Sequence, residues 1–107
     1  MKYITVPISL DAMERLDKDK NLTGDLYEIL LTEDEFSYLW EHNIFKILNN
    51  YLNINIDDYE DESITNYEDL VVMKDVLESN NKNYIVQKLL DLTELAIKYK
   101  TGIFFFF

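Results

Sequence analysis

The chain ends in five apolar residues, Ile103–Phe107, which directly follow a Thr-Gly pair. Ahead of that pair, segment 83–100 places apolar residues at the three- and four-residue spacing of one helix face. Gly102 is typical of a left-handed residue that ends a helix, and bulky aromatic residues favour extended structure. The tail is therefore predicted to be a strand, and so apolar a strand needs cover on both faces or a partner on one of them.

The second strand candidate lies at the other end of the chain. Residues 2–9 (KYITVPIS) alternate and are rich in β-favouring side chains. Pro7 has no amide to donate, so this strand is either an edge strand or ends near that residue. We expect the two terminal segments to pair in a small sheet. The tail phenylalanines are then buried in the protein's own core, each contributing about 1.5–3 kcal/mol, and one or two rings remain free to face a partner.

The segments between the terminal strands are predicted to be mostly helical. A short helix begins after Ser9 or Asp11, and segment 21–31 is predicted as a second helix that starts after Gly24. Thr32 and Glu35 have the spacing of a capping box, and an apolar stripe behind them runs to Tyr51 as one helix.

Segment 54–65 is predicted to be a solvated loop, and Thr65 and Glu68 then form a second capping-box pattern. The helix that they start ends among asparagines, and 83–100 is the last and most regular helix. With 107 residues, 48% of them hydrophobic, the chain is long enough for one packed core. We expect a single α+β domain over 1–107, mostly helical with about four to five helices.

The net charge of −11 is concentrated in the middle of the chain. Residues 21–73 hold thirteen acids against one lysine, whereas the two flanking segments are close to neutral. Such a field repels nucleic acid and anionic lipid and attracts basic proteins. The N-terminus lacks the pattern of a signal peptide and no window is apolar enough to span a bilayer, so the expected location is the cytoplasm.

No residue pattern indicates an enzyme, a metal site or a cofactor. On a calcium-loop template, Asp57 and Asp61 fall on ligand positions, but Tyr59 replaces a ligand and Glu62 replaces the glycine of the turn. His42 is the only histidine and there is no cysteine, which excludes zinc sites and hydrolytic triads of the usual kinds. Two glycines cannot form a phosphate-binding loop.

An interaction surface is the remaining hypothesis. Tyrosines alternate with carboxylates in the acidic segment, a combination that steers basic partners and anchors them. Tyr59 is the best single contact candidate, because it lies in a charged loop where a core role is hard to assign. The predicted partner-binding residues are Asp57, Asp58, Tyr59, Glu60, Asp61, Glu62, Glu68 and Asp69.

The closing stretch ELAIKYKTGIFFFF (94–107) resembles the end of small bacterial immunity proteins of contact-dependent growth inhibition and related polymorphic-toxin systems. Several of these end in a helix, a Thr-Gly break and an aromatic strand. The resemblance implies a small, cytoplasmic, non-enzymatic protein that forms a heterodimer with a cognate toxin domain, often a basic nuclease, and blocks its active site or substrate groove.

Two other functions stay open at this point. An acidic phage-type protein could mimic nucleic acid and inhibit a restriction or CRISPR nuclease, which requires carboxylates spaced along an extended face. A helical interaction module without inhibitory activity is the second alternative. In each case the expected partner is a protein, and neither nucleic acid nor a membrane is expected to bind.

Overall fold

Five helices and four strands follow one another along the chain, all of whose residues, 1–107, are described by a computed structural model. In chain order they are β1 (Lys2–Pro7), α1 (Leu10–Asp17), β2 (Leu26–Leu31), α2 (Glu33–Glu41), α3 (Ile44–Leu52), β3 (Glu62–Ile64), α4 (Tyr67–Ser79), α5 (Tyr84–Tyr99) and β4 (Ile103–Phe106). The predicted α+β class is confirmed.

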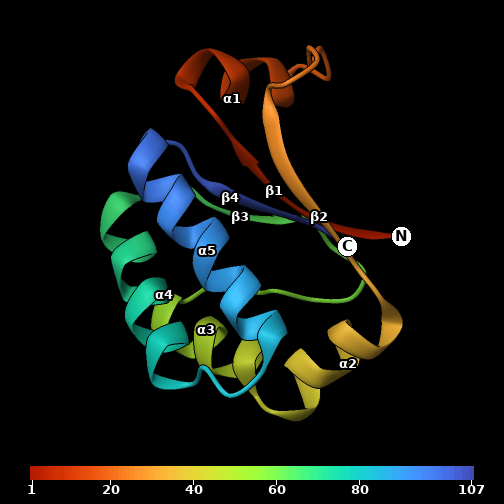
Figure 1. Cartoon of the computed structure of the whole chain (residues 1–107), viewed down its shortest axis with the longest axis vertical. Helices are drawn as coiled ribbons and strands as arrows, with labels where there is room; N and C mark the ends of the chain where they lie inside the picture. Colours follow the sequence, from red (N-terminus) through yellow and green to blue (C-terminus); the bar gives the residue numbers. More distant parts are fainter.

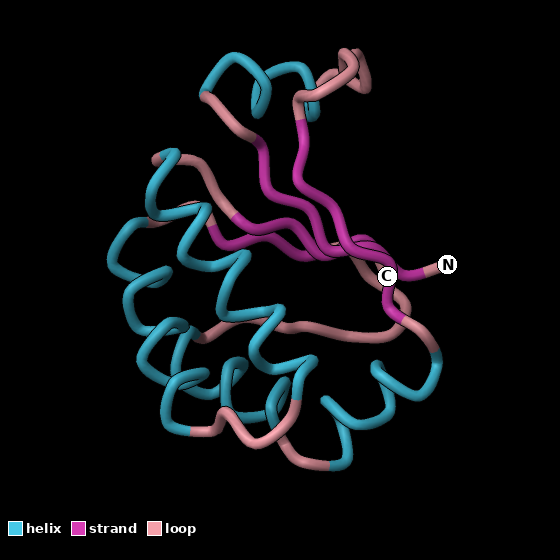
Figure 2. The backbone as a smooth tube through the Cα atoms, in the orientation of Figure 1, coloured by secondary structure: helices cyan, strands magenta, loops and turns pink.

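The strands form one antiparallel sheet in the order β2-β1-β4-β3 (Figure 2). Its two central strands are the two ends of the chain, with Ile4 opposite Phe105, so the predicted pairing of the termini is confirmed. β1 is an interior strand, and Pro7 is its last residue. Only Tyr3 to Thr5 pair with β4, so the missing proline amide costs no bond to that strand.

The segment after Gly24 is a strand, and the helix predicted there is wrong. Leu26–Leu31 pairs residue for residue with β1, from Leu26 opposite Pro7 to Leu31 opposite Lys2. Leucine and glutamate favour a helix whereas tyrosine and isoleucine favour a strand, so the local pattern did not discriminate between them. Pairing with β1 satisfies the backbone and buries Leu31, and this tertiary gain selects the strand.

The single helix predicted behind Thr32 is divided into α2 and α3. The capping box is present as predicted: Glu35 N–H donates to Thr32 Oγ1 at 3.1 Å, and Thr32 N–H donates to Glu35 Oε1 at 2.9 Å. The chain then turns at Asn43, whose φ of 63° is left-handed, a conformation that asparagine tolerates better than most residues. Because of this turn, Tyr51 near the end of α3 is 70% exposed rather than part of a buried stripe.

The boundaries of the last two helices also differ from the predicted ones. α4 is capped by Asn66, whose side chain accepts from Asp69 N–H at 3.2 Å, so the predicted capping box of Thr65 and Glu68 is wrong. α5 ends with Lys100 in the left-handed conformation, not with Gly102.

Position 102 requires glycine because a side chain there would not fit. A Cβ there would lie 2.8 Å from the backbone oxygen of Ile64 and 2.8 Å from the Thr65 side chain. Gly102 therefore allows the start of β4 to lie directly against the end of β3.

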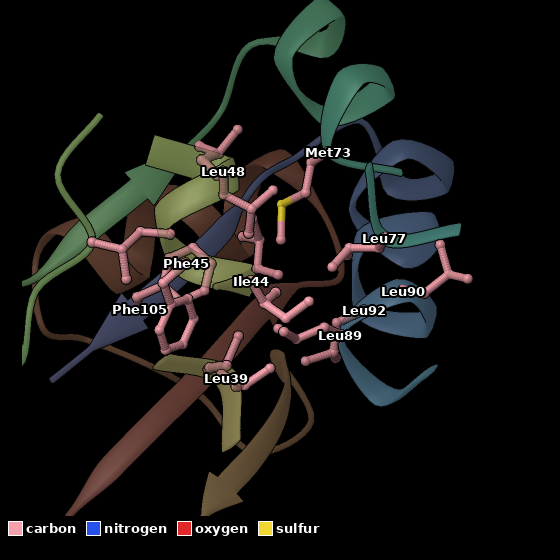
Figure 3. Close-up of a cluster of buried hydrophobic side chains, with 14 of the residues drawn as sticks. Leu39, Ile44, Phe45, Leu48, Met73, Leu77, Leu89, Leu90, Leu92 and Phe105 are labelled. Atoms are coloured by element: carbon pink, nitrogen blue, oxygen red, sulfur yellow. The ribbon is translucent and has the colours of Figure 1, made fainter. Parts of the chain in front are cut away.

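Helices α2 to α5 cover one face of the sheet, while α1 lies at the far end of β1 and β2 (Figure 1). Between this helical layer and the sheet is the core, part of which Figure 3 shows. Each covering helix and β4 contribute a fully buried side chain to it: Leu39, Phe45, Met73, Leu89 and Phe105.

The tail phenylalanines alternate between the two faces of the sheet. Phe105 is fully buried, and the Phe107 ring packs against Phe36 and Phe45 with centroids 5.3 and 5.7 Å apart. The predicted burial in the protein's own core is confirmed for Phe105, and Phe107 is partly buried against that core. Phe104 and Phe106 project from the opposite face and remain partly exposed.

Candidate functional site

The predicted acidic loop contains a tight turn between α3 and β3. Asp57 and Glu60 face each other across it as an isolated β-bridge, and Asp57 Oδ1 accepts from Tyr59 N–H at 3.0 Å. We call residues 57–62 the acidic turn. Such side-chain bonds to the backbone two residues on stabilise turns and give this one a defined shape.

Buried residues on both sides hold the acidic turn to the core. Ile56 before it is fully buried, and Ile64 after it is 3% exposed, so segment 54–65 is not a solvated loop throughout. The Asn49 side chain bonds both backbone groups of Ile56, accepting from its N–H at 2.7 Å and donating to its carbonyl at 3.2 Å. The turn is therefore presented from an anchored base.

Three side chains of the acidic turn are free to meet a partner. Tyr59 is 88% exposed at the tip, and Glu60 and Asp61 are exposed without an ion pair within the protein. An exposed tyrosine between carboxylates combines a large contact area with charges that basic groups approach favourably.

Other predicted contact residues have structural roles. Asp58 forms an ion pair with Lys2 at 2.7 Å, and the Glu62 carboxylate accepts the N–H groups of Asn55 and Ser63 at 3.2 and 3.0 Å. Their charges contribute to the local field, but Asp58 Oδ1 and both Glu62 oxygens already have partners within the protein.

The remaining two predicted residues are not brought together with the acidic turn. Glu68 and Asp69 lie in the first turn of α4, beyond the far end of β3 (Figure 1). Acids in this position stabilise the helix by lying near its positive end.

A groove of about 610 Å³ lies beside the acidic turn and was not evident from the sequence. Its walls include Leu30 of β2, Glu33 and Phe36 of α2, and Asp58 of the acidic turn. Lys2 reaches into it, with its ammonium 4.7 Å from the centre of the Phe36 ring. The groove thus combines apolar surface with two carboxylates, Glu33 and Asp58, and the Lys2 ammonium. These residues come from segments far apart in the chain, which only the tertiary structure brings together.

The buried carboxylates with shifted pKa values are structural. Asp25 accepts two bonds from the Arg15 guanidinium, at 2.8 and 2.7 Å, and one from Leu22 N–H at 2.9 Å, which lowers the pKa of Asp25 to about 2. For Glu35, burial acts to raise the pKa, but the bond from Thr32 N–H contributes to a net lowering. Both carboxylates are therefore ionised near neutral pH and are engaged in bonds within the fold.

The lone histidine has no catalytic partner. The His42 ring stacks on Tyr38 with centroids 3.9 Å apart, and its Nδ1 lies 3.1 Å from the Tyr38 carbonyl oxygen. No group of three or more acids or histidines converges in a way that could hold a metal ion. None of the helices has the length and apolar composition needed to cross a bilayer.

The chain matches no protein-family model, no curated protein and no solved structure in the three comparisons made.

Proposed function

We propose that this chain is an inhibitor of the immunity-protein type, which acts in the cytoplasm by binding a basic toxin domain as a one-to-one heterodimer. The observation that carries the proposal is the acidic turn. Tyr59, Glu60 and Asp61 are free there, on a segment tied to the core, within the part of the chain that holds all of the excess negative charge.

Inhibition follows from the requirements of the partner. A nuclease cleft is lined with lysine and arginine because it must hold phosphates, and carboxylates that enter this field exclude the substrate. Glu60 and Asp61 accelerate the encounter by electrostatic attraction. Tyr59 supplies an anchor that becomes desolvated in the complex and slows dissociation.

The neighbouring groove favours a protein inhibitor over a nucleic-acid mimic. A mimic needs carboxylates spaced along an extended face, as phosphates are. Here the free carboxylates adjoin Tyr59 and a groove with Leu30 and Phe36 in its walls. Apolar anchors mixed with charge are typical of a protein–protein interface.

The test is a pull-down from lysate of the native cell at low and at high salt, followed by identification of the retained polypeptide and assay of its cleavage of DNA and RNA. We expect one basic nuclease, retained less at high salt and inhibited by the wild-type protein. Retention of no basic polypeptide, or of one whose activity is unchanged, would reject the proposed function and favour a module without inhibitory activity.

Charge reversal then tests the acidic turn itself. Glu60→Lys with Asp61→Lys is expected to slow association by about tenfold or more and to weaken its salt dependence. The matched control, Asp17→Lys with Asp91→Lys, changes the net charge equally at exposed helical positions and should associate much faster than the turn variant. Asp58 is left unchanged, because a lysine there would lie against Lys2. Equal rates for the two variants would show that the turn is not the contact.

A further inference from the structure

The face of the sheet that points away from α2–α5 carries no covering layer. Residues opposite each other in the register share a face, so Tyr3, Leu30 and Phe106 project together on the side away from Ile4. Figures 1 and 2 show helices over the other side, with only α1 at one end. We call this side the bare face; its residues are Tyr3, Thr5, Glu28, Leu30, Ser63, Phe104 and Phe106.

The bare face is largely apolar and aromatic. The Phe104 and Phe106 rings lie nearly parallel, with an interplanar angle of 15° and centroids 6.3 Å apart. Leu30 is 48% exposed, and Tyr3 and both phenylalanines keep part of their surface in water, whereas Thr5 projects to this side but is fully buried. Partly exposed aromatic and aliphatic side chains gathered on one face of a sheet are the kind of surface at which another molecule binds.

Positive charge is absent from the bare face. Its one charged residue is Glu28, whose carboxylate accepts the Thr5 hydroxyl at 2.9 Å. The only basic residue in the four strands, Lys2, projects to the other side of the sheet and pairs with Asp58. All other lysines and the arginine lie on the helices or the segments adjoining them.

The bare face is continuous with the acidic turn on two sides. Leu30 belongs to the bare face and also to the wall of the groove that Asp58 closes. On the other side, Ser63 of the bare face follows directly on Glu62, the last residue of the acidic turn. An apolar centre with an acidic segment at its border is the arrangement of an interface core and its polar rim.

We infer that the bare face is the apolar centre of the interface at which the acidic turn forms the rim, and that it binds a basic protein with apolar side chains ringed by lysine and arginine. The inference rests on the proposed function and adds a second contact surface to it. A second copy of this chain is a poor occupant. Two bare faces in contact would bring the two Glu28 carboxylates close together, and likewise the two acidic turns, and these like charges would repel each other.

The test compares three variants in binding to the nuclease that the pull-down identifies. Leu30→Lys places a cation on the bare face, and Phe106→Thr removes a ring from it while keeping a β-favouring residue. Leu22→Lys is the matched control, since Leu22 is also exposed (62%) and lies outside the sheet. We expect the first two variants to raise Kd about tenfold or more, with wild-type thermal transitions as evidence of folding, and Leu22→Lys to bind like the wild type.

The outcomes separate the two proposals. If the bare-face variants bind like the wild type while the turn variant Glu60→Lys with Asp61→Lys binds weakly, the inference about the bare face is wrong and the proposed function stands. If the pull-down retains no basic nuclease, both fail. Sedimentation of the protein alone gives a further check: a dimer that Leu30→Lys dissociates would assign the bare face to self-association and overturn the inference.

Discussion

Phe105 and Phe106 are adjacent in the chain and identical in chemistry, yet they lie in opposite environments. Phe105 has no exposed surface and packs in the core, whereas Phe106 lies on the bare face and stacks on Phe104. Side chains of a strand alternate between the faces of its sheet, so a one-residue step exchanges one environment for the other. The comparison shows that a run of like residues can hold the fold together and present a surface at the same time.

The two faces differ because only one is covered. α5 packs against both central strands, β1 and β4, and α2, α3 and α4 complete the layer over the same face. The covered face therefore supplies stability through apolar burial, and the bare face is available for binding.

The largest effect is expected from truncating the tail rings on the two faces. Phe105→Ala should lower the free energy of unfolding by about 3–5 kcal/mol, because it leaves a cavity in the core. Phe106→Ala should cost about 1 kcal/mol, since part of its ring is already in water. Urea denaturation of the two variants measures both values. Equal losses would mean that the bare face is as much a part of the core as the covered one.

A methyl group at Gly102 tests the join between β3 and β4. Gly102→Ala should lower the free energy of unfolding by about 1–3 kcal/mol, because the added Cβ meets the Ile64 carbonyl oxygen, which cannot move without its strand. Amide exchange in β3 should accelerate as well. Gly24→Ala is the control: its φ of 85° is strained for alanine but nothing lies within 4 Å of the new methyl, so exchange in β3 should not change.

A pH titration separates apolar from ionic stabilisation. The folded pKa of Asp25 is about 2, below its usual value of 3.8, so its pairing with Arg15 stabilises the fold fully only above pH 4. This contribution is lost as the pH falls from about 4 towards 2. The stability difference between the wild type and Asp25→Asn should therefore be constant near neutral pH and shrink below pH 4. The stability difference between the wild type and Phe105→Ala should not shrink below pH 4, because it comes from apolar burial. If both differences changed with pH in the same way, this separation of ionic from apolar stabilisation would be contradicted.

The smallest expected effect is that of Leu30→Lys on folding. Leu30 is 48% exposed on an edge strand, so its replacement should change the free energy of unfolding by only about 0.5 kcal/mol. Thermal denaturation beside the control Leu22→Lys measures it. A loss as large as that of Phe105→Ala would show that Leu30 supports the fold and would remove the basis for using it as a binding probe.

Of the candidate site, the sequence located the acidic turn but not its surroundings. Charge along the chain singled out residues 57–62, and Tyr59 is indeed free at the tip. The sequence pattern did not reveal that Asp58 would be paired with Lys2, because those residues lie far apart in the chain. Nor did it indicate the groove, which forms only where β2, α2 and the N-terminus meet.

What the sequence determined by itself is local. The capping box at Thr32, the long last helix and the extended tail are visible as short-range patterns, because caps and periodicity depend on residues within one or two turns. The tertiary structure alone decided that Leu26–Leu31 is a strand, that Asn43 breaks a helix, and which tail rings face the core. Those outcomes depend on pairing and burial between distant segments, whose free energy exceeds the small local preferences of the residues involved.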